Sequence, residues 1–167
     1  MSTPTIGLFG TCGNSRWREP FVAAYRAEGI PFFDPQLPPG TWTPGCVAEE
    51  NRHLAEDDLV LFPVTHESPG LGSLGEVGFC ALQAIRANRF RQMVFLIDPE
   101  CLDPEATEAI RVESNRARRL VRSKIEAEAR HWHNIHLVET LDTMLSLSLR
   151  LWRIAVEMGA IGADRRA

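Results

Sequence analysis

The sequence predicts a three-layer α/β domain of the flavodoxin-like class, in which about five parallel strands form a doubly wound sheet. Two observations support this prediction. Short, continuously apolar runs recur along the chain, as expected of strands that are covered on both faces. Segments of helical length lie between these runs, and a repeated strand–helix alternation produces a parallel sheet with helices on both sides.

The expected strands cover residues 5–9, 30–33, 59–64, 93–97 and 135–138. Helical periodicity fills the segments between them, and its clearest example is an apolar stripe made of Val77, Cys80, Ala81, Ala84 and Ile85. Another helix is expected to start at Asp103-Pro104, because aspartate caps helices and proline suits the first helical position. In the helical segment that follows, arginines alternate with glutamates, which predicts a solvated face rather than a binding patch for Arg111, Arg116, Arg118, Arg119, Arg122 and Lys124.

The last helix is expected from about Thr140 to Met158 and carries two apolar stripes rather than one. One stripe contains Leu141, Leu145, Leu149, Trp152 and Val156, and the other contains Met144, Leu147, Leu151, Ile154 and Met158. One stripe can face the sheet while the other needs a partner. We therefore expect a homo-oligomer, a dimer or a larger assembly, built partly on this helix, with a broadly buried helix as the alternative.

Composition limits the classes of protein to consider. The 167 residues are 44% hydrophobic and 24% charged, which predicts one globular domain over residues 1–167. A net charge of −4 leaves no overall basic field for a nucleic-acid backbone. The chain lacks a basic, apolar leader and any long apolar run, so we expect a cytoplasmic protein that does not bind membranes. The four cysteines are widely spaced, which predicts free thiols and no metal site.

Ligands of doubly wound sheets bind beyond the carboxyl ends of the strands, where we expect the loops 10–17 and 65–73 to meet. The first loop and the start of the helix after it combine small, hydroxyl and basic residues. Backbone N–H groups at such a turn favour an anion, and arginine binds phosphate in a bidentate manner. The loop is a candidate for binding a phosphate or a sugar, with an ordinary polar turn as the alternative, through Gly10, Thr11, Ser15, Arg16 and Arg18.

The segment after the second strand is long, and long loops of this kind often bind ligands. It begins with Asp34, a candidate ligand-binding residue, and carries Trp42, which could stack on a flat base or simply hold the loop in place. Farther along, Glu50 and His53 lie three residues apart and would share one helix face. Glu50 could therefore supply a second carboxylate or a proton donor to the site.

The segment Gly72-Ser73-Leu74-Gly75-Glu76-Val77-Gly78 follows the third strand and is expected to open a helix with Glu76 in its first turn. A glutamate delivered by a glycine-rich turn at the edge of the sheet is a candidate nucleophile, with Gly72, Ser73 and Gly78 as candidate substrate-binding residues. The structural alternative is a capping box, in which Ser73 and Glu76 satisfy free N–H groups of the helix. Placed at a helix N-terminus, the Glu76 carboxylate is expected to stay ionised with a lowered basicity.

These residues resemble a family, the nucleoside 2-deoxyribosyltransferases and the related 2'-deoxynucleoside 5'-phosphate N-hydrolases. The resemblance covers roughly residues 5 to 98 and rests on LFGTCGNSRWRE, FFDP, EENRHLAEDDLVLFPV and GLGSLGEVGFCAL. It implies that Glu76 attacks the anomeric carbon, that Glu50 stands where the family has an aspartate, and that the loop with Ser15 binds a 5'-phosphate. Gly70 departs from the aspartate or serine of the family at that position. The resemblance requires no metal or organic cofactor.

The expected activity is cleavage or transfer at the N-glycosidic bond of a nucleoside or its 5'-monophosphate. A carboxylate can stabilise the oxocarbenium-like transition state and trap the sugar covalently, as in retaining glycosidases. A non-catalytic domain that binds nucleotide derivatives in the same cleft is one alternative. Another is a cysteine-dependent phosphatase, since Cys12 and Arg18 have the Cys-x5-Arg spacing of its phosphate loop.

Overall fold

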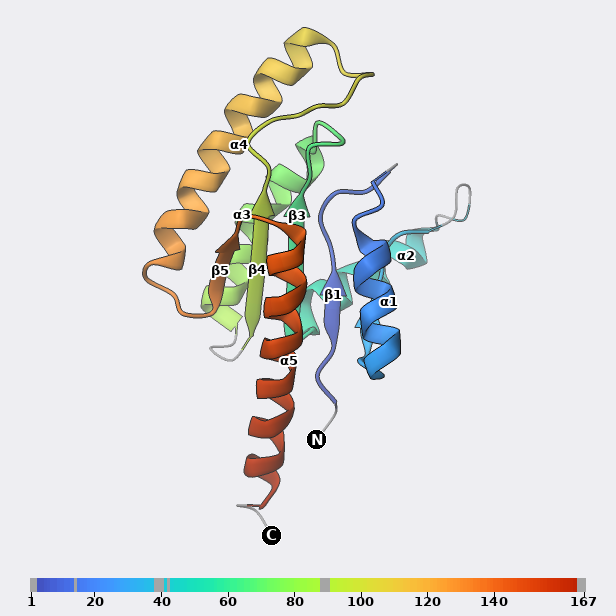
Figure 1. Cartoon of the computed structure of the whole chain (residues 1–167), viewed down its shortest axis with the longest axis vertical. Helices are drawn as coiled ribbons and strands as arrows, with labels where there is room; N and C mark the ends of the chain where they lie inside the picture. The colour runs from blue at the N-terminus through green and yellow to red at the C-terminus, as the bar shows by residue number, and fades with distance from the viewer. Residues whose placement is uncertain (1–2, 14, 38–40, 42, 88–90, 165–167) are drawn as a thin grey trace.

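The computed structural model describes residues 3–13, 15–37, 41, 43–87 and 91–164, without the side chains of 83–87 and 160–164. Five strands alternate with five helices along the described chain (Figure 1). The strands are β1 (Ile6–Leu8), β2 (Phe32–Phe33), β3 (Leu59–Val64), β4 (Gln92–Ile97) and β5 (Ile135–Val138). The helices are α1 (Arg18–Glu28), α2 (Pro44–Glu56), α3 (Leu71–Ala87), α4 (Glu108–Ala129) and α5 (Leu141–Asp164).

All strand pairs of this sheet are parallel, and their order is β2-β1-β3-β4-β5. The chain moves outward in one direction from β1 to β2 and then in the other from β3 to β5. The predicted flavodoxin-like fold is therefore confirmed, with its topological switch point between β1 and β3. The loops that follow these two strands meet there, because parallel strands end at the same edge.

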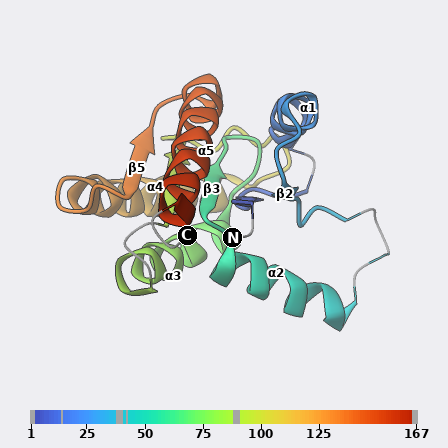
Figure 2. The same cartoon turned by 90° about the horizontal axis from the view of Figure 1, so that it is seen from below.

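Two apolar cores cover the two faces of the sheet, since successive side chains of a strand point to opposite faces. Leu59 and Leu61 of β3 belong to the core shared with α1 and α5, whereas Val60 and Phe62 belong to the core shared with α3 and α4. Figure 2 shows α1 and α5 on one side of the sheet and α3 on the other, with α2 extending outward on the side of α3. The continuous apolar runs thus reflect strands buried on both faces.

Helix α5 packs on the sheet only over its first half. Met144 is fully buried there, and members of both predicted stripes are partly buried around it. The helix then continues past the strands, as Figure 1 shows, with Ile154, Val156 and Met158 exposed. Both stripes therefore contact the body of the protein, and only their last residues are exposed. That a second copy covers them stays a prediction.

Two expectations for α4 are wrong. The helix begins at Glu108, and the side chain of Thr107 caps it by accepting a hydrogen bond from the N–H of Ile110. Asp103 instead accepts the N–H of Glu105 in the preceding turn. Arg118, predicted on a solvated face, is completely buried.

In the described part of the chain, no helix has both the length and the apolar character needed to cross a membrane.

Candidate functional site

A pocket of about 350 Å³ opens between the end of β2 and helix α2. Its wall combines apolar side chains with three carboxylates. The residues that form it are Phe33, Asp34, Pro35, Leu37, Thr43, Gly45, Cys46, Glu49 and Glu50. Two of the predicted site residues, Asp34 and Glu50, thus lie in one pocket, whereas Glu49 was not predicted as a site residue. Trp42, the other residue predicted from this segment, lies outside the described residues.

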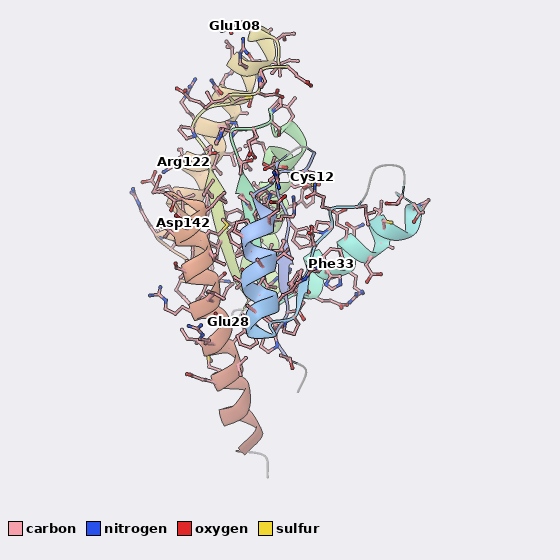
Figure 3. All side chains as sticks on the ribbon, turned by 45° about the vertical axis from the view of Figure 1, so that its right-hand side comes forward. Cys12, Glu28, Phe33, Glu108, Arg122 and Asp142 are labelled. Carbon is pink, nitrogen blue, oxygen red and sulfur yellow. The ribbon has the colours of Figure 1, made fainter. Side chains whose placement is uncertain are left out.

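Helix α2, which carries the outer wall, has no buried residue among its 13. Its carboxyl-terminal end holds it to the sheet. The His53 ring stacks on Phe33 with 3.8 Å between ring centroids, and its Nδ1 lies 2.8 Å from Oδ1 of Asp57. Arg91 donates hydrogen bonds to the carbonyls of Leu54 and Ala55. Figure 3 marks Phe33 next to this helix. The pocket wall is therefore fixed at one end of α2.

The two predicted catalytic carboxylates lie on neighbouring helices and interact electrostatically. Partial desolvation, and secondly the negative charge of Glu50, raise the pKa of Glu76 above that of an ordinary glutamate. Glu76 nevertheless remains an exposed residue of α3, so substrate can reach it. Glu50 lines the pocket, whereas Glu76 is not among its described lining residues. Two carboxylates that perturb each other are typical of acid–base and nucleophilic sites.

The predicted position of Glu76 in the first helical turn is wrong. Helix α3 begins at Leu71, directly after Gly70, whose φ of 62° places it in the left-handed region. The N–H of Leu74 donates to the carbonyl of Gly70, so Ser73 lies inside the helix and cannot be its N-cap. Glu76 is in the second turn, where the helix N-terminus does not lower its pKa. The capping-box interpretation is therefore wrong as well.

The loops after β1 and β3 meet at the switch point, as expected, and hydroxyl groups link them. The Thr11 hydroxyl donates to the carbonyl of Pro63 and accepts the N–H of Thr65. Ser15 donates to the carboxylate of Glu67, which also accepts the hydroxyl of Thr65. Gly10 is required here, because a Cβ at this position would lie 2.2 Å from the carbonyl oxygen of Pro63. Thr11 and Ser15 thus already hold the two loops together.

The two arginines predicted to bind an anion have partners within the protein. Arg18 is 2% exposed, and its guanidinium donates to the carbonyls of Leu8 and Thr11. Its Nε also lies 3.3 Å from the carboxylate of Asp34. Arg16 is exposed and forms a bidentate pair with Glu19. That these side chains bind phosphate stays a prediction, and neither is poised for it.

The remaining predicted residues are Gly72, Ser73 and Gly78, all on α3. A Cβ added to Gly72 or Gly78 would meet no described atom within 4 Å, so these glycines leave open space beside the helix. For Ser73, the contacts of the described residues give no indication of a ligand-binding role. Among the described residues, no three His, Cys, Asp or Glu side chains lie close enough to hold a metal ion.

Arg118 is the residue of this region that sequence reasoning missed. Arg118 has the largest fully buried side chain among the described residues. Its guanidinium lies beneath the loop after β3. The guanidinium donates to the hydroxyl of Ser114 and to four backbone carbonyls at or beyond the ends of β3 and β4, those of Val64, Thr65, Ser68 and Asp98. The apolar residues Ala117, Val121 and Ile125 recur every four residues along α4 and pack against the core, and this spacing could have indicated a buried face beside Arg118. Arg118 fixes the loop that leads into α3 and hence to Glu76.

The sequence matches no protein-family model, and no curated protein matches it. A functional conclusion for this chain therefore rests on the residues of the site and their geometry.

Proposed function

We propose that the protein acts on the N-glycosidic bond of a nucleoside or its 5'-monophosphate, with Glu76 as nucleophile and Glu50 as acid–base partner. The reaction either cleaves this bond or transfers the sugar to another base. One observation carries the proposal: Glu50 lines the pocket and is close enough to Glu76 for its charge to raise the pKa of that carboxyl. The pocket volume is at the small end of the range for ligand sites, which suits a ligand of nucleoside size.

In the first step, an oxygen of the Glu76 carboxylate bonds to the anomeric carbon while the bond from that carbon to the base breaks. The bonding electrons leave with the base, and protonated Glu50 gives it a proton. In the second step, Glu50 removes a proton from water, the water oxygen bonds to the anomeric carbon, and Glu76 is released. A second base in place of water gives transfer of the sugar.

The nucleophilic role requires Glu76 to be ionised, and its raised pKa shifts that state to higher pH than for an ordinary glutamate. Once ionised, a carboxylate with a higher pKa is the stronger base, and its proximity to a second carboxylate favours a state in which one of the two holds a proton. A general acid contributes about 10²- to 10⁴-fold to such reactions. The apolar wall made by Phe33, Pro35 and Leu37 offers a surface for the flat base.

The first prediction tests this chemistry by the Glu76→Gln substitution. Purified parent and variant are incubated with ribonucleosides, deoxyribonucleosides and their 5'-monophosphates, and free base is followed by chromatography. We expect the variant to lose about 10³-fold or more of the parent rate, because an amide cannot form the glycosyl ester. Mass spectrometry of the parent during turnover should show the mass of the covalently bound sugar, which Glu76→Gln should lack.

Two control variants sharpen this experiment. Glu56→Gln changes the same residue type at an exposed position outside the pocket wall, and Cys12→Ser removes the nucleophile of the phosphatase alternative. Both should keep the parent rate. Loss of activity in Cys12→Ser with retention in Glu76→Gln would reject the proposal. Nucleoside binding without base release by the parent would instead favour a binding domain that does not turn over its ligand.

A further inference from the structure

The charges around the pocket distinguish two substrate classes that the proposed function leaves open. Asp34, Glu49 and Glu50 contribute three carboxylates to the wall, and none of its described residues is a lysine, arginine or histidine. When all three are ionised, the described wall residues carry three negative charges and no positive one, and two of these charges, on Asp34 and Glu49, remain when Glu50 holds the proton that it gives to the base. The printed sequence between Leu37 and Thr43, Pro-Pro-Gly-Thr-Trp, contains no ionisable side chain either.

The described arginines near this wall, Arg18 and Arg52, are engaged with groups of the protein, and each is paired with a carboxylate of the wall. The guanidinium of Arg52 contacts Glu49 at 2.8 Å, Glu56 at 3.4 Å and the His53 ring at 2.9 Å. Arg18 donates to backbone carbonyls and has its third nitrogen 3.6 Å from the Cys12 sulfur. These pairs reduce the negative field of the wall, and neither of these two arginines keeps an unengaged guanidinium to hold a phosphate.

A second, independent observation comes from the loop that would hold a 5'-phosphate. The Ser15 hydroxyl, the group expected to donate to a phosphate oxygen, donates to the carboxylate of Glu67. The Thr65 hydroxyl donates to the same carboxylate at 3.0 Å. An anion at this position would have to displace Glu67 and would meet its charge. The loop is thus occupied by an anionic side chain of the protein itself.

We infer that the site takes the uncharged nucleoside and discriminates against its 5'-monophosphate, with Glu49 as a specificity-determining residue. This inference rests on the proposed function, because it concerns the substrate of the same site. Sugar hydroxyls and base amino groups are hydrogen-bond donors, which suit the three carboxylates as acceptors. A phosphate dianion is an acceptor only, and in a partly enclosed pocket its repulsion by carboxylates is screened less than in bulk water.

The test compares kcat/KM for each nucleoside with that for its 5'-monophosphate. We expect the nucleoside to be preferred by about tenfold or more, since one charge at close range suffices for such a factor. The preference should shrink as salt is added, because salt screens the repulsion. Equal or better use of the monophosphates would overturn the inference while leaving the proposed bond cleavage intact.

A matched pair of charge reversals identifies the source of the discrimination. Glu49→Lys and Glu56→Lys remove partners of the same arginine and change the net charge equally, but only Glu49 lines the pocket. We expect Glu49→Lys to raise the ratio of monophosphate to nucleoside kcat/KM by about tenfold or more and Glu56→Lys to change it less than about twofold. Equal effects of the two variants would show a general charge effect and overturn the role of Glu49.

If no substrate releases its base, the proposed function fails, and the inference is then tested by binding alone. Titration calorimetry with adenosine, deoxyadenosine and their 5'-monophosphates gives the same ratios without turnover. Tighter binding of the nucleosides supports the inference for a binding site. Tighter binding of the monophosphates, or no binding of either class, overturns it.

Discussion

The two carboxylates of the candidate site come from regions that are held in different ways. Glu76 follows a loop whose carbonyls are gathered by the fully buried guanidinium of Arg118. Glu50 lies on α2, which has no buried residue and is attached through contacts near its carboxyl-terminal end. Figure 2 shows the same contrast, with α3 against the sheet and α2 extending outward.

This difference assigns different tasks to the two regions. A nucleophile must be held close to its reacting atom, and small displacements reduce rates strongly. The Arg118 region meets that requirement because its hydrogen bonds converge on the loop before α3. A pocket wall that selects a ligand can instead be formed by a helix held at one end. We therefore expect the largest losses of stability from the Arg118 region and more local effects from α2.

The second prediction removes the buried guanidinium. Arg118→Met should lower the free energy of unfolding by about 3–5 kcal/mol, because carbonyls at the ends of β3 and β4 then lose their buried donors. Arg118→Lys keeps the charge but has fewer donors and should lose less. Chemical denaturation of both variants measures these losses.

Its matched control is Arg119→Met on the same helix. Arg119 is exposed, so its substitution should change the free energy of unfolding by no more than about 0.5 kcal/mol. Similar losses in Arg118→Met and Arg119→Met would show that the buried guanidinium does not organise this region.

The third prediction loosens the attachment of α2. His53→Ala removes the stack on Phe33 and the hydrogen bond to Oδ1 of Asp57, whose buried Oδ2 has no hydrogen-bond partner among the described residues. We expect a loss of about 2 kcal/mol, since a buried carboxylate then keeps fewer partners. Hydrogen exchange should show the loss of protection in α2 first, with smaller changes in α3.

Two variants define what His53 does. His53→Phe keeps an aromatic ring on Phe33 without the hydrogen bond, so it should recover part of the stability. His133→Ala removes an exposed histidine elsewhere and should have almost no effect. Uniform loss of protection across the sheet in His53→Ala would contradict a local attachment of α2.

The sheet could be predicted from the sequence because its strands are buried on both faces, so their apolar runs are uninterrupted. The start of α3 could not, because Gly70, Gly72 and Gly75 are all plausible ends of the preceding loop. Only the left-handed φ of Gly70 decides between them. A difference of a few residues moved Glu76 from the first turn to the second, away from the helix N-terminus. Its pKa is raised instead of lowered, because partial desolvation and the charge of Glu50 act on it.

Part of the site could be predicted because its residues belong to expected elements. Asp34 directly follows an expected strand, Glu50 lies on an expected helix face, and both line one pocket. The partners of Arg18 and Arg118 could not be read from the chain, because they are carbonyls whose positions depend on the folded loops. Arginines that look like anion-binding residues in sequence can instead satisfy buried backbone groups, a need that only the tertiary structure reveals.

The last and smallest effect tests the link between the two regions. Glu50→Gln removes the negative charge that helps to raise the pKa of Glu76, so this pKa should fall toward that of an ordinary glutamate. It should stay somewhat raised, because partial desolvation, the larger cause, remains. Carbon-13 NMR titration of the Glu76 carboxyl measures the change directly, with Glu56→Gln as control.

The pH dependence of the reaction rate tests the same link. In Glu50→Gln, the acid limb of this profile should move to lower pH, since Glu76 must be ionised to attack. Nicotinamide riboside is the suitable substrate, because its base leaves uncharged without a proton from Glu50. An unchanged titration of Glu76 would separate the two carboxylates and leave α2 with a role in selecting the ligand alone.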